Sequence, residues 1–89
     1  MRISYPVIIR PQKPKGYIVR FPDIEEAFTQ GDTLDECLFN AAEVLTLVLK
    51  HRLEENLPIP DPSQVEGAHW VSPDAETQEA IILRQARGD

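Results

Sequence analysis

The sequence predicts one domain of the α+β class, in which a three-stranded antiparallel meander precedes a long helix, a fourth strand and a C-terminal helix. Two short segments near the N-terminus alternate apolar and polar residues, as strands do, and a third short segment follows them. A longer segment then repeats apolar residues at helical spacing. The 89 residues, 42% of them hydrophobic, supply enough apolar side chains for one core but not for two.

The first two strands are predicted over residues 3–10 and 17–21, and a turn rich in Pro, Lys and Gly joins them as an antiparallel pair. Alternate apolar side chains share one face, which we expect to lie in the core: Ile3, Tyr5, Val7 and Ile9, then Tyr17, Val19 and Phe21. Pro6 has no N–H to donate to a neighbouring strand, so we expect a gap or a bulge in the pairing beside it.

A third strand is predicted over residues 25–31, and a long helix begins after Gly31. Thr33 and Glu36 have the spacing of a capping box, in which both side chains accept hydrogen bonds from backbone amides at the helix start. Apolar residues then recur every three or four positions and form a stripe wide enough to cover a sheet: Leu34, Cys37, Leu38, Ala41, Leu45, Val48, Leu49 and Leu53.

The rest of the chain is predicted as a proline-rich connection, a short strand and a closing helix. Three prolines alternate within residues 56–63, which excludes a helix and predicts a stiff extended segment. Such a segment could also dock in a groove of a partner. Residues 68–71 predict the fourth strand, and we expect Pro73 at the first helical position of a helix over residues 75–87.

Several features of the sequence indicate a cytoplasmic protein. The N-terminus lacks a charged leader followed by an apolar stretch, and no apolar run approaches the ~20 residues that cross a bilayer. Cys37 is the only cysteine, whereas small domains of oxidising compartments usually carry several disulfides. We therefore expect residence in the cytoplasm and no membrane partner.

Charge is distributed unevenly along the chain. The net charge is -6, and all 15 acidic residues lie at or after Asp23, while five of the nine basic residues precede it. A chain this acidic is a poor ligand for a phosphate backbone. The distribution favours a basic protein partner for the later segments, although an acidic surface also serves solubility alone.

No residue pattern predicts catalysis, a metal or a cofactor. His51 and His69 are 18 residues apart and Cys37 lies on the apolar helix stripe, so no metal-ligand spacing is present. The four glycines are scattered, and no serine lies in a Gly-flanked nucleophile motif. Several carboxylates could together hold a magnesium ion, but a solvated helix start explains them better: Asp32, Asp35, Glu36 and Glu43.

A set of stretches distributed along the chain resembles a known family. They are residues 5–9 (YPVII), 16–23 (GYIVRFPD), 29–37 (TQGDTLDEC), 40–41 (NA) and 57–63 (LPIPDPS). Together they resemble the N-terminal domain of HicB antitoxins over residues 1–73. The resemblance implies a partial ribonuclease H-like fold, in which the strand after the long helix lies beside the first strand.

The resemblance also implies a function. HicB antitoxins bind a HicA-like toxin, a small basic protein that cleaves messenger RNA, and block its active site. Ribonuclease H chemistry needs clustered carboxylates, one of them on the first strand, yet residues 1–22 contain no Asp or Glu. We therefore expect an antitoxin that is not an enzyme.

The resemblance further implies how the chain is divided. We expect residues 1–73 to form the toxin-neutralising domain and residues 74–89 to form the C-terminal helix. Many HicB proteins carry an additional DNA-binding module, and the 16 residues after Pro73 are too few for one. The chain is then either a short family member or one cut in the helix that leads to such a module. In both cases we expect no specific operator binding.

The toxin-binding residues are predicted in the turn between the second and third strands. Asp23, Glu25 and Glu26 surround Ile24, which would give a charged rim beside an exposed apolar anchor. An ordinary solvated turn is the competing interpretation. Trp70 is a secondary candidate because Trp is enriched at interfaces, although it more readily fills the core of its own domain.

An alternative function is that of a small RNA-binding module. Tyr5 and Tyr17 would be its stacking faces, and its basic residues would be Arg2, Arg10, Lys13, Lys15 and Arg20. The acidic composition argues against it, as does the prediction that both tyrosines face the core. Exposed strand edges also predict a homodimer, besides a hetero-oligomer with the toxin.

Overall fold

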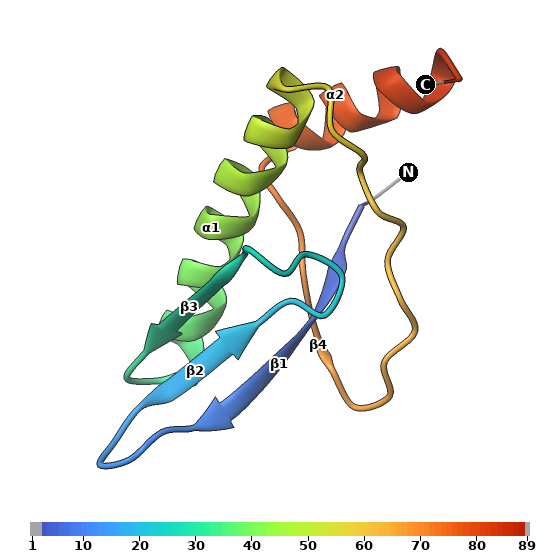
Figure 1. The fold of residues 1–89 in the computed structure, drawn as a ribbon. Coiled ribbons are helices and arrows are strands. Elements are labelled where there is room, and N and C mark those ends of the chain that lie inside the picture. Colours follow the sequence, from blue (N-terminus) through green and yellow to red (C-terminus); the bar gives the residue numbers. More distant parts are fainter. Residues whose placement is uncertain (1–2, 89) are drawn as a thin grey trace.

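The computed structural model describes residues 3–88 and has the predicted α+β architecture (Figure 1). In chain order the elements are β1 (Tyr5–Pro11), β2 (Tyr17–Arg20), β3 (Phe28–Gly31), α1 (Leu34–Glu54), β4 (His69–Val71) and α2 (Ala75–Ala86). The predicted succession of three strands, a long helix, a fourth strand and a closing helix is confirmed. Among the described residues, no helix has the length and apolar character needed to span a bilayer.

The strands form one antiparallel sheet in the order β3-β2-β1-β4. Residues 8–11 of β1 pair with β2, and residues 5–7 pair with β4. The fourth strand therefore lies beside the first, as the family resemblance implies. Pro6 lies in the part of β1 that pairs with β4 alone, which agrees with the predicted gap.

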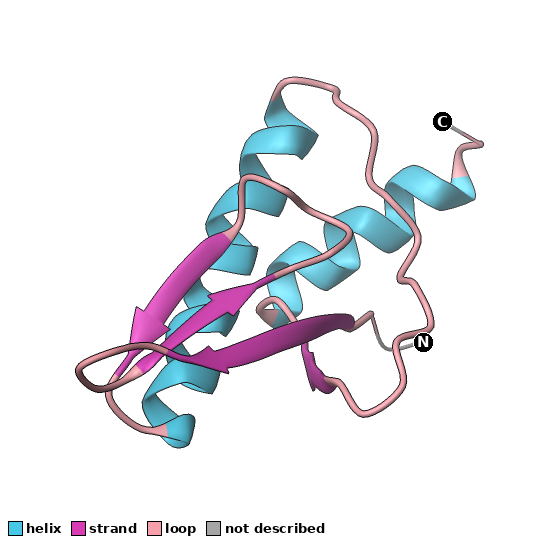
Figure 2. Ribbon diagram, turned by 60° about the horizontal axis from the view of Figure 1, so that its bottom comes forward, coloured by secondary structure: helices cyan, strands magenta, loops and turns pink. Residues whose placement is uncertain are grey.

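The core lies between α1 and one face of the sheet (Figure 2). α1 contributes Cys37, Ala41, Leu45 and Leu49, which recur every four residues and are fully buried. The strands contribute alternate side chains predicted for the core, among them Tyr5, Val7 and Val19, and Phe21 adds another directly after β2. The opposite face of the sheet carries neither of the described helices and is left open.

Both helices begin with a side-chain cap. The Thr33 hydroxyl accepts a hydrogen bond from the Glu36 backbone N at 3.1 Å, and Glu36 Oε1 accepts one from the Asp32 backbone N at 2.9 Å. The predicted capping pair is thus confirmed. Asp74 caps α2, so the prediction of Pro73 as the first helical residue is wrong, because Pro73 lies before the cap.

The third strand is shorter than predicted. Residues 25–27 do not pair with β2, because the chain turns twice before Phe28. Ile24 donates from its backbone N to the Phe21 carbonyl at 3.2 Å, and Ala27 donates to the Ile24 carbonyl at 3.0 Å. These turns place all four predicted contact residues between the second and third strands before β3 begins: Asp23, Ile24, Glu25 and Glu26.

Candidate protein interface

The predicted contact residues between β2 and β3 lie in different surroundings. Ile24 is 0% exposed, so its prediction as an exposed anchor is wrong. Full burial of an isoleucine side chain is worth about 1.5–3 kcal/mol, which favours an inward orientation in a domain this small. Asp23 and Glu26 have partners in other segments, and Glu25 is exposed to solvent.

Asp23 and Glu26 fasten the proline-rich segment to this turn. Asp23 accepts hydrogen bonds from the Ser63 backbone N at 3.0 Å and from the Ser63 hydroxyl. Glu26 accepts two hydrogen bonds from Arg52, through Nε and Nη2, each at 2.8 Å. Arg52 also donates from Nη1 to the Pro58 carbonyl at 2.9 Å. Both carboxylates are therefore engaged within the chain.

These contacts shift the titration of the groups involved. The hydrogen bonds from Arg52 lower the pKa of Glu26, and Glu26 in turn raises the pKa of Arg52. The Tyr5 hydroxyl donates to the Pro60 carbonyl at 2.7 Å. Burial, followed by nearby carboxylates such as Asp23, raises the pKa of Tyr5 to about 12. The proline-rich segment is thus held against its own domain at several points.

The strand register gathers exposed apolar side chains on the face of the sheet that α1 does not cover. Successive side chains alternate between the two faces, so cross-strand partners share a face. We call this surface the open face, and its members are Ile8, Arg10, Ile18, Arg20, Phe28, Gln30 and Trp70. Pro6 lies on the same face, but its side chain is fully buried. Phe28 is 66% exposed, Trp70 45% and Ile18 39%, which is typical of a surface that binds a partner.

Trp70 lies on the open face, so the expectation that it fills the core is wrong. Trp70 is opposite Pro6 in the β1–β4 register. Its neighbour Val71 points the other way and is only 6% exposed. The position of Trp70 is compatible with its prediction as an interface residue.

Glu25 lies at the margin of the open face, beside two shallow hollows. The first has a volume of about 500 Å³ and is lined by Ile8, Arg10, Arg20, Phe21, Pro22 and Glu25. The second has a volume of about 380 Å³ and is lined by Ile18, Arg20, Glu25 and Phe28. Glu25 and Trp70, two of the five predicted contact residues, are therefore on or beside one surface, while the other three serve the fold.

Sequence reasoning did not single out Phe28, Ile18, Arg10 and Arg20 as members of one surface. The sequence did contain an indication of this surface, in the period-two alternation of β1 and β2. The faces of these strands that point away from the core carry Ile8, Arg10, Ile18 and Arg20. Recognising the surface also required the register between strands, which alternation within a single strand does not give.

The basic residues of the alternative function are divided between two regions. Within the described chain they are Arg10 and Arg20 on the open face and Lys13 and Lys15 in the exposed turn between β1 and β2. Arg2 lies outside the described residues. Tyr5 is buried and Tyr17 is half-buried against the core, so neither tyrosine offers a stacking face.

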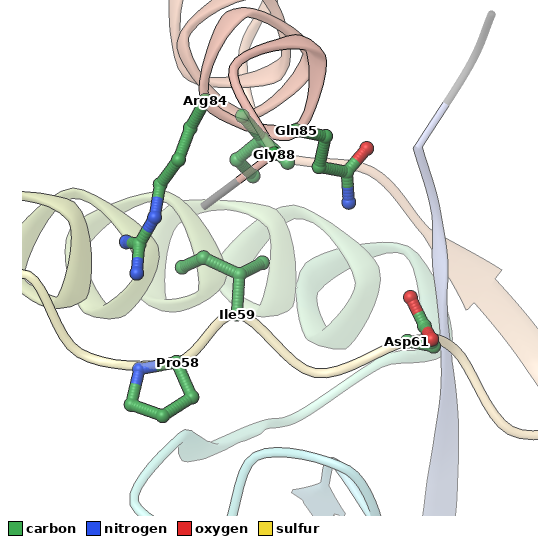
Figure 3. A pocket seen from close by; sticks show the side chains of 7 residues that line it. Pro58, Ile59, Asp61, Arg84, Gln85 and Gly88 are labelled. Atoms are coloured by element: carbon green, nitrogen blue, oxygen red, sulfur yellow. The ribbon is translucent and has the colours of Figure 1, made fainter.

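A separate hollow of about 460 Å³ lies between the proline-rich segment and α2 (Figure 3). The Arg84 side chain extends from α2 towards Ile59 and Pro58, and its Nη1 is buried without a hydrogen-bond partner among residues 3–88. In the same part of the chain, no three His, Cys, Asp or Glu side chains gather in a way that could hold a metal ion. The exposed aromatic side chains Phe28 and Trp70 belong to the open face and not to this hollow.

Comparison with known proteins places this chain in a family. Residues 4–72 match the model of the HicB-like antitoxins of bacterial toxin-antitoxin systems. The match covers most of the 89 residues, and the chain belongs to this family.

Curated relatives carry antitoxin names. Antitoxin HicB 1 of Photorhabdus laumondii is 38% identical over 84 residues, and Antitoxin HicB of Escherichia coli strain K12 is 34% identical over 85 residues. Each alignment covers 94% of this chain but only 54% and 62% of the respective relative. The chain therefore spans little more than half the length of these relatives.

Two solved structures of toxin-antitoxin complexes contain similar chains. A chain of the HicA3 and HicB3 toxin-antitoxin complex has a TM-score of 0.64 and 26% identity, covering 81% of this chain and 99% of that one. A chain of a toxin-antitoxin complex from Streptococcus pneumoniae has a TM-score of 0.73 and 23% identity. The match covers 85% of this chain and 71% of that one. The second likeness concerns the fold alone.

Proposed function

We propose that this chain neutralises a HicA-like, messenger-RNA-cleaving toxin in the cytoplasm by binding over its active site, without chemistry of its own. The observation that carries the proposal is the open face of a HicB-like family member, on which Phe28, Trp70 and Ile18 are exposed together. Similar chains occur in solved toxin-antitoxin complexes, which supports a toxin as the partner.

The open face has the composition of a protein-binding surface. Trp and Arg are enriched among the residues that dominate binding energy, and both occur here. Complete burial of a side chain such as Phe28 contributes about 1.5–3 kcal/mol, so a few anchors supply much of the affinity. Arg10 and Arg20 on the face and Glu25 at its margin give two positive charges and one negative charge, which would orient the partner.

The other predicted contact residues have a supporting role in this proposal. Asp23 and Glu26 hold the turn to the proline-rich segment, and Ile24 anchors the turn in the core. Together they fix Glu25 at the margin of the open face. Glu25 and Trp70 are therefore the predicted residues that we expect to touch the toxin.

Co-expression tests the proposed function. The toxin gene would be the neighbour of the gene for this chain, and its expression in a bacterial host should stop growth. Co-expression of this chain should restore growth, and the purified chain should leave RNA intact with or without magnesium. The proposal fails if growth stays arrested when both proteins accumulate.

RNA binding is a second candidate function, because Arg10 and Arg20 share the open face with Phe28 and Trp70. Exposed aromatic side chains beside arginines bind single-stranded RNA by stacking and charge. Fluorescence anisotropy with a labelled oligouridine distinguishes the two functions. The antitoxin proposal predicts no saturable binding at physiological salt, whereas binding that the double variant Arg10→Gln, Arg20→Gln loses would favour the RNA-binding module.

The assembly formed by the chain stays a prediction. β3 and β4 are the edge strands of the sheet, and either could pair with another chain. One acceptor on β3 is already used, because Asn40 Nδ2 donates to the Gln30 carbonyl at 2.9 Å. Light scattering after size-exclusion chromatography would distinguish a homodimer from a hetero-oligomer that forms only with the toxin.

A further inference from the structure

A second apolar surface lies on α1, away from the open face. Phe39 is 65% exposed and Leu47 is 68% exposed, although both belong to a helix whose opposite side fills the core. They line a groove of about 500 Å³ together with Ala42, Glu43, Thr46, Ser72, Pro73 and Asp74. We call this the α1 groove.

The α1 groove has a ridge, a floor and a wall. Phe39, Glu43 and Leu47 follow one another at four-residue spacing and form the ridge. Ala42 and Thr46 have small side chains, so they form a floor that allows close approach.

Residues 72–74 form the wall, where the chain passes from β4 to α2 beside α1 (Figure 1). The wall is fixed in place, because the Asp74 backbone N donates to Thr46 Oγ1 at 2.9 Å. Lys50 Nζ also lies 3.6 Å from Asp74 Oδ2 and 3.5 Å from Glu76 Oε1. The groove is therefore held by α1 and by the start of α2.

The charged groups around the α1 groove are mainly acidic. Glu43 interrupts the ridge between its two apolar residues, and Asp74 lies on the wall. Asp35 is one turn before Phe39 on the same side of α1 and is exposed. Lys50 is the basic group beside the groove in the described structure, and it is already paired with two carboxylates. Asp74 is one of the two carboxylates that pair with Lys50, so Asp35 and Glu43 are the acidic groups that a partner would meet along the ridge. An apolar groove with carboxylates along its ridge complements a cationic, amphipathic partner.

The length of the ridge indicates the form of that partner. Phe39 and Leu47 are eight residues apart on one helix, which corresponds to about 12 Å along its axis. Apolar residues at positions i and i+7 of an incoming helix span about 10 Å. One apolar stripe of a helix could therefore pack along the whole ridge.

We propose that the α1 groove binds a cationic amphipathic helix of a protein partner, as a docking site separate from the open face. The apolar stripe of that helix packs between the ridge and the wall, against Ala42 and Thr46. Its Lys or Arg side chains pair with the exposed carboxylates of Glu43 and Asp35 along the ridge. This interface goes beyond the proposed blocking of a toxin active site, and it holds or fails independently of it.

The probe for this test is a synthetic helix of about 16 residues, with Leu at positions i, i+3, i+4 and i+7 and Lys elsewhere. A control peptide carries Glu in place of every Lys. NMR titration of the isotope-labelled full chain should shift resonances of residues 39–47 and 72–74 with the cationic peptide and not with the acidic one. Raising the salt concentration should weaken the binding.

Variants of the groove and matched controls make the test specific. Leu47→Ser and Glu43→Lys should each weaken binding roughly tenfold or more. Leu83→Ser removes a leucine that is 55% exposed on α2, outside the groove, and Glu66→Lys makes the same charge change as Glu43→Lys in an exposed loop. Both controls should bind the peptide with unchanged affinity, and all four variants should retain the dispersed spectrum of the folded chain.

Several results would overturn the proposal. They are no binding of the cationic peptide, equal binding of the acidic peptide, shifts confined to the open face, or unchanged affinity of both groove variants. Conversion of a dimer into a monomer by Leu47→Ser would assign the groove to a second copy of this chain instead.

Discussion

Arg52, near the end of α1, connects two other segments of the chain, one of which lies 26 residues before it. Its guanidinium makes two hydrogen bonds to Glu26 in the β2–β3 turn and one to the Pro58 carbonyl in the proline-rich segment. The Arg52 side chain is only 18% exposed, so the pair is less screened than an ordinary surface ion pair. A planar, bidentate donor is required, because Lys cannot reproduce this geometry.

We predict that Arg52→Lys lowers the free energy of unfolding by about 1 kcal/mol, through loss of the bidentate contact. Urea denaturation of the purified chain measures this change. Arg87→Lys, at an exposed position at the end of α2, is the matched control and should change stability little. Equal stability of Arg52→Lys and the wild type would show that Arg52 does not hold the proline-rich segment.

The Glu26 carboxylate makes the stability that this contact contributes depend on pH. Its pKa is lowered in the folded chain, chiefly by the hydrogen bonds from Arg52, so the native state favours the charged form. The resulting stabilisation is present above the ordinary pKa of Glu and is lost as the pH falls through the lowered value. We predict that the wild type loses more stability than Glu26→Gln between about pH 6 and about pH 3, measured by urea denaturation. Parallel stability curves for the two proteins would contradict this prediction.

Tyr5 makes the stability of the chain depend on pH in the opposite direction, with a loss at high pH. Burial raises its pKa from 10.0 to about 12, so the folded chain holds the phenolic proton more tightly than the unfolded chain does. The stabilisation is present below the unfolded pKa and is lost as the pH rises through the folded one. We predict that the wild type loses stability above about pH 10 more steeply than Tyr5→Phe, which has no proton to lose. Ultraviolet absorbance of the tyrosinate checks the titration directly.

At the scale of elements, Gly31 sets how closely β3 approaches α1. A Cβ atom at this position would lie 3.0 Å from both the backbone N and Sγ of Cys37, at the start of α1. One of these two atoms belongs to the backbone of α1, so it cannot easily move to make room for an added Cβ atom. We predict that Gly31→Ala destabilises the chain by about 1–3 kcal/mol, measured by thermal or urea unfolding. Gly67→Ala is the comparison variant, because Gly67 has open space around it and any cost there comes from its positive φ and not from a steric contact. Unchanged stability of Gly31→Ala would contradict the prediction.

The elements themselves were largely predictable from the sequence, because periodicity reports which side of a strand or helix is apolar. The core face of β1 and the α1 stripe follow from alternation and from three- and four-residue spacing. The beginning of β3 was not predictable, since the two local turns that shorten it bury Ile24 and Ala27 in the core, which the residue pattern of this segment does not report.

The candidate interface was harder to predict, because its membership depends on register and on long-range partners. Asp23 and Glu26 resemble free surface carboxylates until Ser63 and Arg52 are placed beside them, 40 and 26 residues further along the chain. Trp70 could be assigned to the open face only after its pairing with Pro6 was known.

At the scale of the whole molecule, the sheet separates two surfaces of different character. The open face combines exposed aromatic side chains with Arg10 and Arg20, whereas the α1 groove on the helical side is bordered by Glu43 and Asp74. The basic residues early in the sequence and the acidic residues later in it thus lie on different surfaces of the folded chain. A basic toxin could be attracted over long range by the acidic segments and held at short range by apolar anchors.

The most direct test of the proposed toxin-binding surface is calorimetric titration of the full chain with the toxin encoded beside it. We predict that Trp70→Ser and Phe28→Ser each raise the dissociation constant by roughly tenfold or more, whereas Leu83→Ser leaves it unchanged. Equal affinities for the wild type and both open-face variants would contradict the proposed toxin-binding surface.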